Sequence, residues 1–372
     1  QNVKNTVHRF KQSFDSRAQL YGNPVTGEST SRSDFLLNIQ WVMEKHDLLV
    51  IHHGALGDVV ATFPALLKLK KKYGRMGMLC ESKIGRLARF LDIVDNHFPI
   101  ETAAFATLYS GRVDPVVKNI LLGYAKIALF SRARNLQNTL MSITGKAVCR
   151  IHPQPDIDQK IHVAEHALSN LVRCGFLEKT DVDTGFISSS AIHPDRRDPN
   201  FDRSRILIHP GSGSRKKCWP VSNFVRIARS LRARGKRPEF ILGPAEYDLA
   251  EILTRQFFHQ DEYSRKIYRM DNLTELALRL KASGGFIGND SGISHLSAFL
   301  GLPTVAVFGP SDPQRWRPVG RNVAIVRPEL DCSPCFETDR VGCETMECLS
   351  RTSYKDVLKA YCRLSSRYAP AP

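Results

Sequence analysis

The feature that most constrains this chain is a repeated alternation of short apolar runs with longer segments of helical periodicity. Alternation of this kind predicts parallel strands joined by right-handed helical crossovers, and therefore a doubly wound α/β sheet. In the first half we expect strands and helices over the following ranges. The strands are residues 48–52, 76–80, 97–100 and 147–151, and the helices are residues 59–73, 84–90, 116–128 and 162–174.

The alternation stops in a polar stretch rich in Pro and Asp and then starts again. The second half predicts strands at residues 205–209, 239–242, 285–288 and 304–308, with helices at 221–234, 247–258, 273–282 and 292–300. We therefore expect two facing Rossmann-like domains with a ligand cleft between them. The predicted divisions are an N-terminal extension (1–46), a first domain (47–190), a linker (191–204), a second domain (205–350) and a C-terminal helix and tail (351–372). The extension includes a possible helix at residues 35–45.

Composition and charge narrow the class of protein. Of the 372 residues, 42% are hydrophobic and 24% are charged, which is typical of a globular protein. No apolar run reaches the ~18–20 residues of a membrane-spanning helix, and the start does not resemble a secretory signal, so a cytoplasmic protein is expected. The net charge of +16 favours an anionic partner, although the basic residues are dispersed along the chain.

The first chemical motif, Gly54-Ala55-Leu56-Gly57-Asp58, follows the first predicted strand. Glycines at such a turn let the backbone approach a ligand at the carboxyl end of the sheet. Asp58 has two compatible interpretations. It can cap a helix that begins at Val59, or its carboxylate can act as a general base in the cleft.

Two further turns suit phosphate groups. The loop from His209 to Pro220 (HPGSGSRKKCWP) combines backbone N–H groups, two hydroxyls and three cations, but it lacks the ending of a Walker A loop. The segment from Gly288 to His295 (GNDSGISH) places small residues at a predicted helix N-terminus, where the helix dipole favours an anion. His295 lies one turn into that helix. The two loops together predict a diphosphate site in the second half.

The segments IHHGALGD, IHPGSGSRKKCWP, LGPAE and FIGNDSGISHLSAFLGLPTVAVFGPSDP, in this order, resemble glycosyltransferase family 9, the ADP-heptose:lipopolysaccharide heptosyltransferases. The similarity extends from about Leu48 to the C-terminus. It implies the GT-B fold and an inverting, metal-independent transfer of heptose from ADP-heptose to the lipid A–Kdo inner core. It therefore implies that no cofactor is needed. The implied partners are a nucleotide sugar and an anionic glycolipid at the cytoplasmic face of the inner membrane, with peripheral attachment and no nucleic acid.

The resemblance also implies residue roles. Asp58 would deprotonate the acceptor hydroxyl, on a side that also includes His53, Gly54 and Gly57. On the donor side, Lys217, Ser212 and Ser214 would bind the diphosphate, Glu246 the ribose hydroxyls and Met270 the adenine. Asp290 would hold heptose hydroxyls, and Ser291, Gly292 and His295 the phosphates. His53 departs from the family pattern, since many members have Pro there, and Cys218 replaces a common polar residue.

The nine cysteines include a C-terminal cluster of Cys332, Cys335, Cys343 and Cys348. Its spacing suits a tetrahedral thiolate site for zinc or iron, but packed reduced thiols are the favoured interpretation, and whether a metal binds is left open. Cys80 and Cys149 end apolar runs and are expected to be small buried side chains.

Several alternatives remain open from the sequence. The enzyme could use another nucleotide-sugar donor, or a protein or another glycan as acceptor. A sugar-nucleotide epimerase of GT-B architecture would share the fold, but the GALGD and NDSGISH motifs argue against it. A nucleic-acid-binding protein with a four-cysteine metal site fits the charge. It lacks basic stretches interleaved with aromatic residues, and it leaves the phosphate-suited loops unexplained.

Overall fold

The computed structural model describes residues 47–110, 112–182, 198–257, 267–330 and 345–367, together with positions 332, 334, 335 and 343. The predicted N-terminal extension with its possible helix, and the first half of the predicted linker (191–197), lie outside the described residues. We call residues 47–182 the N-terminal half and residues 198–367 the C-terminal half. The division into two domains at the predicted boundaries stays a prediction.

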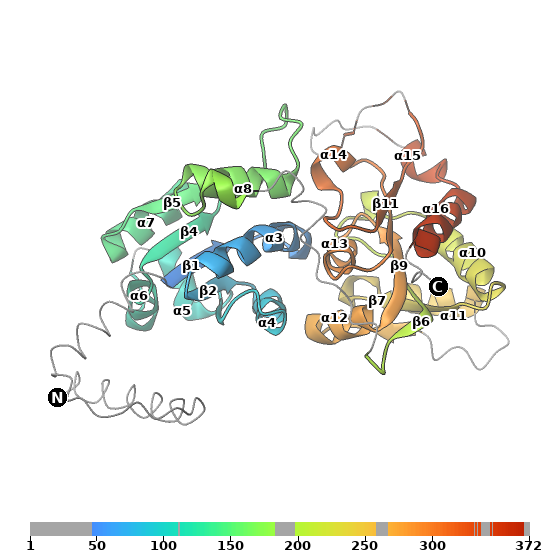
Figure 1. Ribbon diagram of the computed structural model, residues 1–372, viewed down its shortest axis with the longest axis horizontal. Helices are drawn as coiled ribbons and strands as arrows, with labels where there is room; N and C mark the ends of the chain where they lie inside the picture. Colours follow the sequence, from blue (N-terminus) through green and yellow to red (C-terminus); the bar gives the residue numbers. More distant parts are fainter. Residues whose placement is uncertain are drawn as a thin grey trace. The chain divides into compact units, whose positions relative to one another are not determined.

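The N-terminal half is built on a five-stranded parallel sheet in the order β3-β2-β1-β4-β5 (Figure 1). The central strand β1 is buried along its whole length, as expected for a strand with helices on both faces. The strands are β1 (Asp47–His52), β2 (Arg75–Cys80), β3 (Asn96–Pro99), β4 (Lys126–Phe130) and β5 (Val148–Ile151). The helices are α3 (Leu56–Lys72), α4 (Ser82–Phe90), α5 (Ala103–Ala106), η1 (Thr107–Tyr109), α6 (Pro115–Leu122), α7 (Arg134–Thr144), α8 (Val163–Arg173) and η2 (Lys179–Asp181).

The predicted helix at residues 116–128 is correct up to Leu122 and wrong beyond it. Helix α6 ends at Leu122, and Gly123 caps it with its N–H bonded to the carbonyl of Asn119. Strand β4 then pairs directly with β1, and α7 follows. The strand was missed because its sequence, buried after the exposed Lys126, continues the apolar pattern of α6. Periodicity cannot separate a short buried strand from a helical segment.

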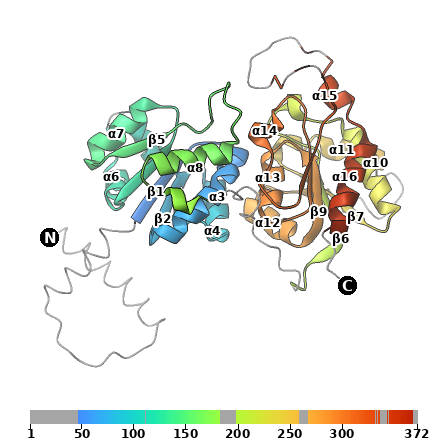
Figure 2. The same ribbon diagram turned by 45° about the horizontal axis from the view of Figure 1, so that its top comes forward.

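The C-terminal half contains a six-stranded parallel sheet in the order β11-β10-β9-β6-β7-β8 (Figure 2). The strands are β6 (Asp202–His209), β7 (Arg237–Leu242), β8 (Ile267–Arg269), β9 (Ser283–Asn289), β10 (Thr304–Val307) and β11 (Val323–Val326). The helices are η3 (Arg215–Lys217), α10 (Val221–Arg232), η4 (Pro244–Glu246), α11 (Leu249–Phe257), α12 (Leu273–Lys281), α13 (Gly292–Phe299), α14 (Pro313–Trp316), α15 (Glu347–Ser350) and α16 (Tyr354–Arg367). The two edge strands β8 and β11 were not predicted, because they are short and only partly buried.

The two halves share a hydrophobic core cluster. Helix α3 packs against α13, and α4 packs against α12. At the first contact the rings of Phe63 and Phe299 meet edge to face with centroids 5.4 Å apart, and both side chains are fully buried. The same cluster contains Leu276 of α12 and Leu87 of α4. Burial of aromatic and aliphatic side chains on both sides fixes the N-termini of α3 and α13 close to each other.

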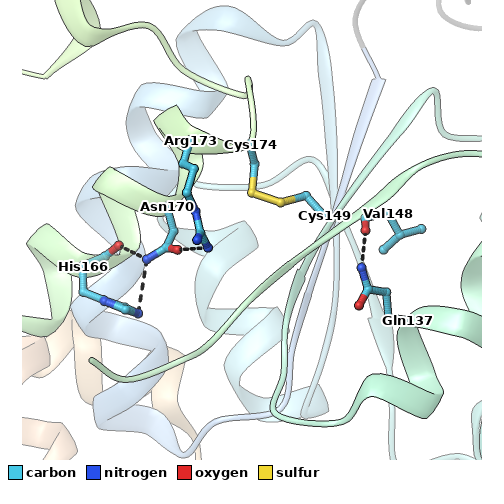
Figure 3. Close-up of a disulfide and its surroundings, with 7 residues drawn as sticks. All are labelled: Gln137, Val148, Cys149, His166, Asn170, Arg173 and Cys174. Carbon is cyan, nitrogen blue, oxygen red and sulfur yellow. Dashed lines mark hydrogen bonds between the residues drawn. A yellow bond between two sulfur atoms is a disulfide. The ribbon is translucent and has the colours of Figure 1, made fainter. Parts of the chain in front are cut away.

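The expectation for Cys80 is confirmed, since its side chain is buried at the end of β2. The expectation for Cys149 is wrong. Figure 3 shows Cys149 of β5 in a disulfide with Cys174, which follows α8. Strand β5 is an edge strand, so a side chain on it can reach the end of α8 rather than the core of the sheet. The disulfide therefore links β5 to the end of α8, and the loop between these two elements lies within the covalently closed segment.

None of the helices among the described residues has the length and apolar character needed to cross a membrane.

Candidate functional site

The turn after β1 presents Asp58 at the start of α3. The helix begins at Leu56, three residues before the expected start, so Asp58 is not the N-cap. Instead it occupies the third helical position, and its Oδ2 accepts a hydrogen bond from the N–H of Ala55 at 3.2 Å. The helix-capping and general-base interpretations remain compatible, because one carboxylate oxygen can serve the backbone while the other faces the pocket.

The pKa of the Asp58 carboxyl is raised by burial. Four interactions oppose the increase: the Ala55 N–H, the charge of Lys217, the Gln154 side chain and the charge of Arg132. A carboxylate with a raised pKa is a stronger base than an ordinary aspartate.

The two neighbouring histidines are neutral and less suitable as bases. Burial, and then the nearby His53, lower the pKa of His52 to about 3. Its Nδ1 already accepts the N–H of Gly54 at 3.0 Å. Burial also lowers the pKa of His53, whose Nδ1 is hydrogen-bonded to the Tyr109 hydroxyl at 3.0 Å. With a pKa of about 3, His52 takes a proton weakly and is a poor base.

The loop between β6 and α10 is held in place by Asn289 at the end of β9. Its side-chain oxygen accepts the N–H of Trp219 at 3.0 Å, and its nitrogen donates to the carbonyl of Pro210 at 2.7 Å. The Ser212 hydroxyl donates to the carbonyl of Asp290 at 2.6 Å. These bonds join the two predicted phosphate loops into one surface.

Lys217 and Asp290 form an ion pair across this surface. Lys217 Nζ lies 2.9 Å from Asp290 Oδ2, and the two side chains are 18% and 5% exposed. The charges of the two side chains therefore compensate each other in a largely dehydrated place.

The β9–α13 turn provides a helix N-terminus. Ser291 is the N-cap, and its hydroxyl accepts the N–H of Ser294 at 3.3 Å. Gly292 lies so close to α3 that a Cβ on it would be 2.8 Å from the backbone nitrogen of Gly57. The absence of a side chain at Gly292 therefore lets the two helix N-termini meet. Both direct their partial positive charge to the same place.

His295 lies one turn into α13 with 3% of its surface exposed, and burial lowers its pKa to about 4. Its ring is therefore neutral at pH 7. The Nδ1 atom is buried and has no hydrogen-bond partner among the residues that the structure describes. A buried polar atom without a partner costs free energy, so a ligand that bonds to Nδ1 would offset that cost.

These turns surround one pocket of about 770 Å³. The structure brings nine of the predicted site residues to its wall and leaves four outside. Those on the wall are Gly57, Asp58, Ser212, Ser214, Lys217, Asp290, Ser291, Gly292 and His295, and those outside are His53, Gly54, Glu246 and Met270.

Of the four residues outside the pocket, Gly54 and Glu246 pack against two of the turns that form its wall. Gly54 is adjacent to the Asp58 Cβ, with His53 before it. Glu246 packs against Gly211 of the first phosphate loop, and its Oε2 accepts the N–H of Gly243 at 2.9 Å. Met270 follows β8, with its N–H bonded to the carbonyl of Leu242 at 2.8 Å. The roles assigned to the four residues stay predictions.

Sequence reasoning missed several residues of the pocket wall. Arg132 follows β4, Gln154 follows β5, and Arg315 and Trp316 belong to α14. Arg132 and Gln154 could have been found from their positions just after strands, because the residues that follow parallel strands lie together at one edge of the sheet. Arg132 was not found because its strand was interpreted as a helix.

The part of the chain at residues 154–344 matches the family model for glycosyltransferase family 9 (heptosyltransferase). This chain belongs to that family. It is 23% identical over 296 residues to lipooligosaccharide heptosyltransferase 2 of Campylobacter jejuni subsp. jejuni serotype O:6, covering 76% of this chain and 88% of the relative. The chain is therefore a glycosyltransferase, as predicted.

Two solved structures show the same fold. One is ADP-heptose LPS heptosyltransferase II of E. coli, with a TM-score of 0.64, 15% identity, and coverage of 87% of this chain and 99% of that one. The other is a family 9 glycosyl transferase from Veillonella parvula, with a TM-score of 0.68, 18% identity, and coverage of 87% and 98%. The predicted GT-B fold is confirmed.

The C-terminal cysteines Cys332, Cys335, Cys343 and Cys348 lie near enough to one another to interact electrostatically. Burial raises the pKa of the Cys348 thiol, and the other three cysteines raise it further. Among the residues described, no three His, Cys, Asp or Glu side chains are arranged to hold a metal ion. Whether this cluster binds a metal stays open.

Proposed function

We propose that this enzyme transfers heptose from ADP-heptose to the Kdo or heptose of a lipopolysaccharide inner core, with inversion and without a metal ion. The relative from Campylobacter is named a lipooligosaccharide heptosyltransferase, and the E. coli structure is named an ADP-heptose heptosyltransferase. Motif order and pocket chemistry support the same reaction here.

The observation that carries the proposal is the convergence of two kinds of chemistry on one pocket. The N-terminal half contributes Asp58, a base with a raised pKa. The C-terminal half contributes Lys217, the N-terminus of α13 and the unpartnered Nδ1 of His295. Transfer of a sugar from a nucleoside-diphosphate donor requires both a base for the acceptor hydroxyl and a surface that binds the diphosphate anion.

In the proposed reaction the acceptor hydroxyl gives its proton to the Asp58 carboxylate. The acceptor oxygen then forms a bond to the anomeric carbon of the heptose, while the bond from that carbon to the diphosphate oxygen breaks. ADP leaves with the bonding electron pair. A single displacement of this kind inverts the anomeric configuration.

The growing charge on the diphosphate would be stabilised by Lys217 and by the N–H groups at the start of α13, without a metal ion. Ser212, Ser214, Ser291, Gly292 and His295 would bind the phosphates. Asp290 would bind heptose hydroxyls, Glu246 the ribose and Met270 the adenine.

The direct test is a transfer assay with ADP-heptose and a Kdo-bearing lipid A acceptor, preceded by a thermal-shift panel of ADP, UDP, GDP and CMP. We expect ADP to stabilise the protein most, and heptose to appear on the acceptor with inverted configuration. Stabilisation by another nucleotide alone would assign a different donor. No transfer to the lipid acceptor, with transfer to another glycan or a protein, would assign a different acceptor.

Metal independence is tested separately. Transfer should continue after treatment with EDTA, since Lys217 and a helix N-terminus would offset the leaving-group charge. Loss of transfer that magnesium or manganese restores would contradict the proposal. Loss that only zinc or iron restores would instead indicate a role for the cysteine cluster.

We also propose that the acceptor is reached at an anionic membrane surface by peripheral contact. The net charge of +16 supports this, because basic residues are attracted to anionic headgroups. Binding to vesicles with anionic lipid should be strong at low salt and weak at ~0.5 M salt, where the Debye length is only a few Å. Binding unchanged over this range would contradict an electrostatic contact.

A further inference from the structure

One arginine joins the two halves at the pocket wall. Arg315 of α14 is 3% exposed, and its guanidinium donates to backbone carbonyls of the loop between β5 and α8. The donor–acceptor distances are 2.9 Å to Pro155, 2.7 Å to Asp156 and 2.9 Å to Gln159, with a longer 3.4 Å contact to Ile157. A buried guanidinium needs acceptors of this kind, because it has only donors to offer.

The loop itself buries few of its side chains. Residues 156–161 are all exposed, and Ile157 is 64% exposed although it is apolar. A segment without buried side chains gains almost nothing from the hydrophobic effect. Its position therefore depends on polar anchors, and Arg315 supplies several of them through one planar group.

A second anchor lies at the end of the same loop. The Nδ1 of His162 accepts the N–H of Ala164 at 3.1 Å as the N-cap of α8, so the ring proton is on Nε2. That Nε2 donates to the carbonyl of Arg317 at 2.8 Å. Burial lowers the pKa of His162, which keeps the ring neutral and this tautomer in place. The loop is thus tied to the C-terminal half at both ends.

The other end of the loop reaches Asp58. Gln154 precedes the anchored segment, and its Oε1 accepts a hydrogen bond from Arg132 Nη2 at 2.5 Å. The amide NH₂ is then left to donate. Gln154 and Asp58 line the same pocket, and an interaction with the Gln154 side chain lowers the pKa of the Asp58 carboxyl. Gln154 directly precedes Pro155, whose carbonyl Arg315 binds.

We propose that Arg315 is a positioning residue for the transfer reaction. By binding carbonyls of the loop from the opposite half, it places the Gln154 amide against the Asp58 carboxyl. The inference rests on the proposed role of Asp58 as the base. It adds that the donor-binding half controls the geometry of the base in the other half.

The pH dependence of the transfer rate would change if Arg315 positions Gln154 against the base. It would not change if Arg315 only stabilised the fold. The groups facing Asp58 are the Ala55 N–H, Lys217 of η3, Arg132 after β4 and Gln154 after β5, with the neutral His52 beside it. Loss of the Gln154 interaction removes one of the influences that hold the Asp58 pKa down. That pKa then rises, and the acidic limb of the rate profile moves to higher pH.

The experiment compares Arg315→Lys with Gln154→Leu in the full chain. Arg315→Lys keeps the charge but loses the planar fork that binds several carbonyls at once. We expect both variants to lower kcat by roughly 10–100-fold, the scale of misplaced catalytic groups, with little change in ADP affinity. Both should move the acidic limb upward by a similar amount, and combining them should add little. Gln314→Ala, at an exposed position of the same helix, is the control and should behave as wild type.

The Asp58 pKa is measured independently of transfer by NMR of ¹³C-labelled aspartate, assigned with Asp58→Asn. An upward shift in Arg315→Lys supports the proposal even if the donor or acceptor is not the one proposed. An unchanged Asp58 pKa in Arg315→Lys, with a raised one in Gln154→Leu, would overturn it.

If Arg315→Lys does not fold, the double variant Asp158→Gly with Gln159→Gly loosens the same loop at exposed positions. It should raise the Asp58 pKa by a smaller amount. No shift in that folded variant would also overturn the proposal.

Discussion

The two halves use the same local unit, a parallel strand followed by a tight turn and a helix N-terminus, for different chemistry. In the N-terminal half the start of α3 carries Asp58, whose buried carboxyl has a raised pKa. In the C-terminal half the start of α13 carries Ser291 as its cap, and the adjacent carboxylate of Asp290 is paired with Lys217. A buried carboxylate with a raised pKa is suited to act as a base, whereas a carboxylate paired with a cation leaves the helix N-terminus available for an anion. The side chains of the turn, rather than the fold, decide which role each half has.

The largest expected effect tests the base in the N-terminal half. Asp58→Asn should lower turnover by roughly 10²–10⁴-fold, the usual contribution of a positioned base, while ADP affinity stays near wild type. The fold should persist, because the amide oxygen can still accept the Ala55 N–H. Turnover and ADP binding are measured on the same folded sample.

Asp114→Asn is the matched control for this change. Asp114 caps α6 in the same half by accepting the N–H of Val116, and asparagine caps equally well. The control should keep wild-type turnover. Near-normal turnover in folded Asp58→Asn would show that the carboxylate serves only the helix, and His53 would be the next residue to test.

The next effect tests the cation of the C-terminal half. Lys217→Ala should weaken ADP binding by ~1–3 kcal/mol, because it removes a charge-assisted contact and leaves Asp290 unpaired near the diphosphate. Calorimetry and thermal shift with ADP measure the change. Lys216→Ala, at the exposed neighbouring position, is the control. Equal loss in both variants would point to general charge attraction instead of a specific contact.

A third change sharpens the comparison where the two helices meet. Gly292→Ala would place a Cβ 2.8 Å from the Gly57 nitrogen, whereas Gly57→Ala would place one 3.4 Å from the Gly292 Cα. The first should cost ~1–3 kcal/mol of unfolding free energy, the usual range for overpacking, and the second less than ~0.5 kcal/mol. Urea unfolding of both variants measures the difference. Equal stabilities would mean that the contact between the halves adapts freely.

The smallest expected effect is a difference between the pH dependence of turnover, which depends on the N-terminal half, and that of ADP binding, which depends on the C-terminal half. Asp58 must be deprotonated to act as a base, and burial raises its pKa. Turnover should therefore fall on acidification at a higher pH than the ~3.9 of an ordinary aspartate. His295, with a pKa of about 4, stays neutral over the same range, so ADP binding should change little above pH 5. Parallel loss of turnover and ADP binding on acidification would contradict this separation.

The sequence predicts the pocket residues that lie in the three motif turns better than it predicts the other residues of the pocket wall. Asp58, Lys217 and Asp290 were found because each follows an apolar strand in a local pattern of glycines, hydroxyls and cations. Arg132 was missed with strand β4, whose apolar residues continue the helical pattern before it. Arg315 could not be found from local sequence at all, since its partners are separated from it by about 156–160 residues. Contacts of this kind depend on how the two sheets pack, and no short pattern records that.

The ion pair between Lys217 and Asp290 has a consequence for the end of the catalytic cycle. In the proposed reaction, an incoming diphosphate would draw Lys217 away from Asp290 or share it, so part of the attraction between Lys217 and the nucleotide would offset the loss of that ion pair. When ADP departs, Lys217 and Asp290 could pair again at 2.9 Å, so the Lys217 ammonium would keep a counterion in its largely buried surroundings. Asp290 would thus compete with the spent nucleotide for Lys217, which would favour product release and limit product inhibition.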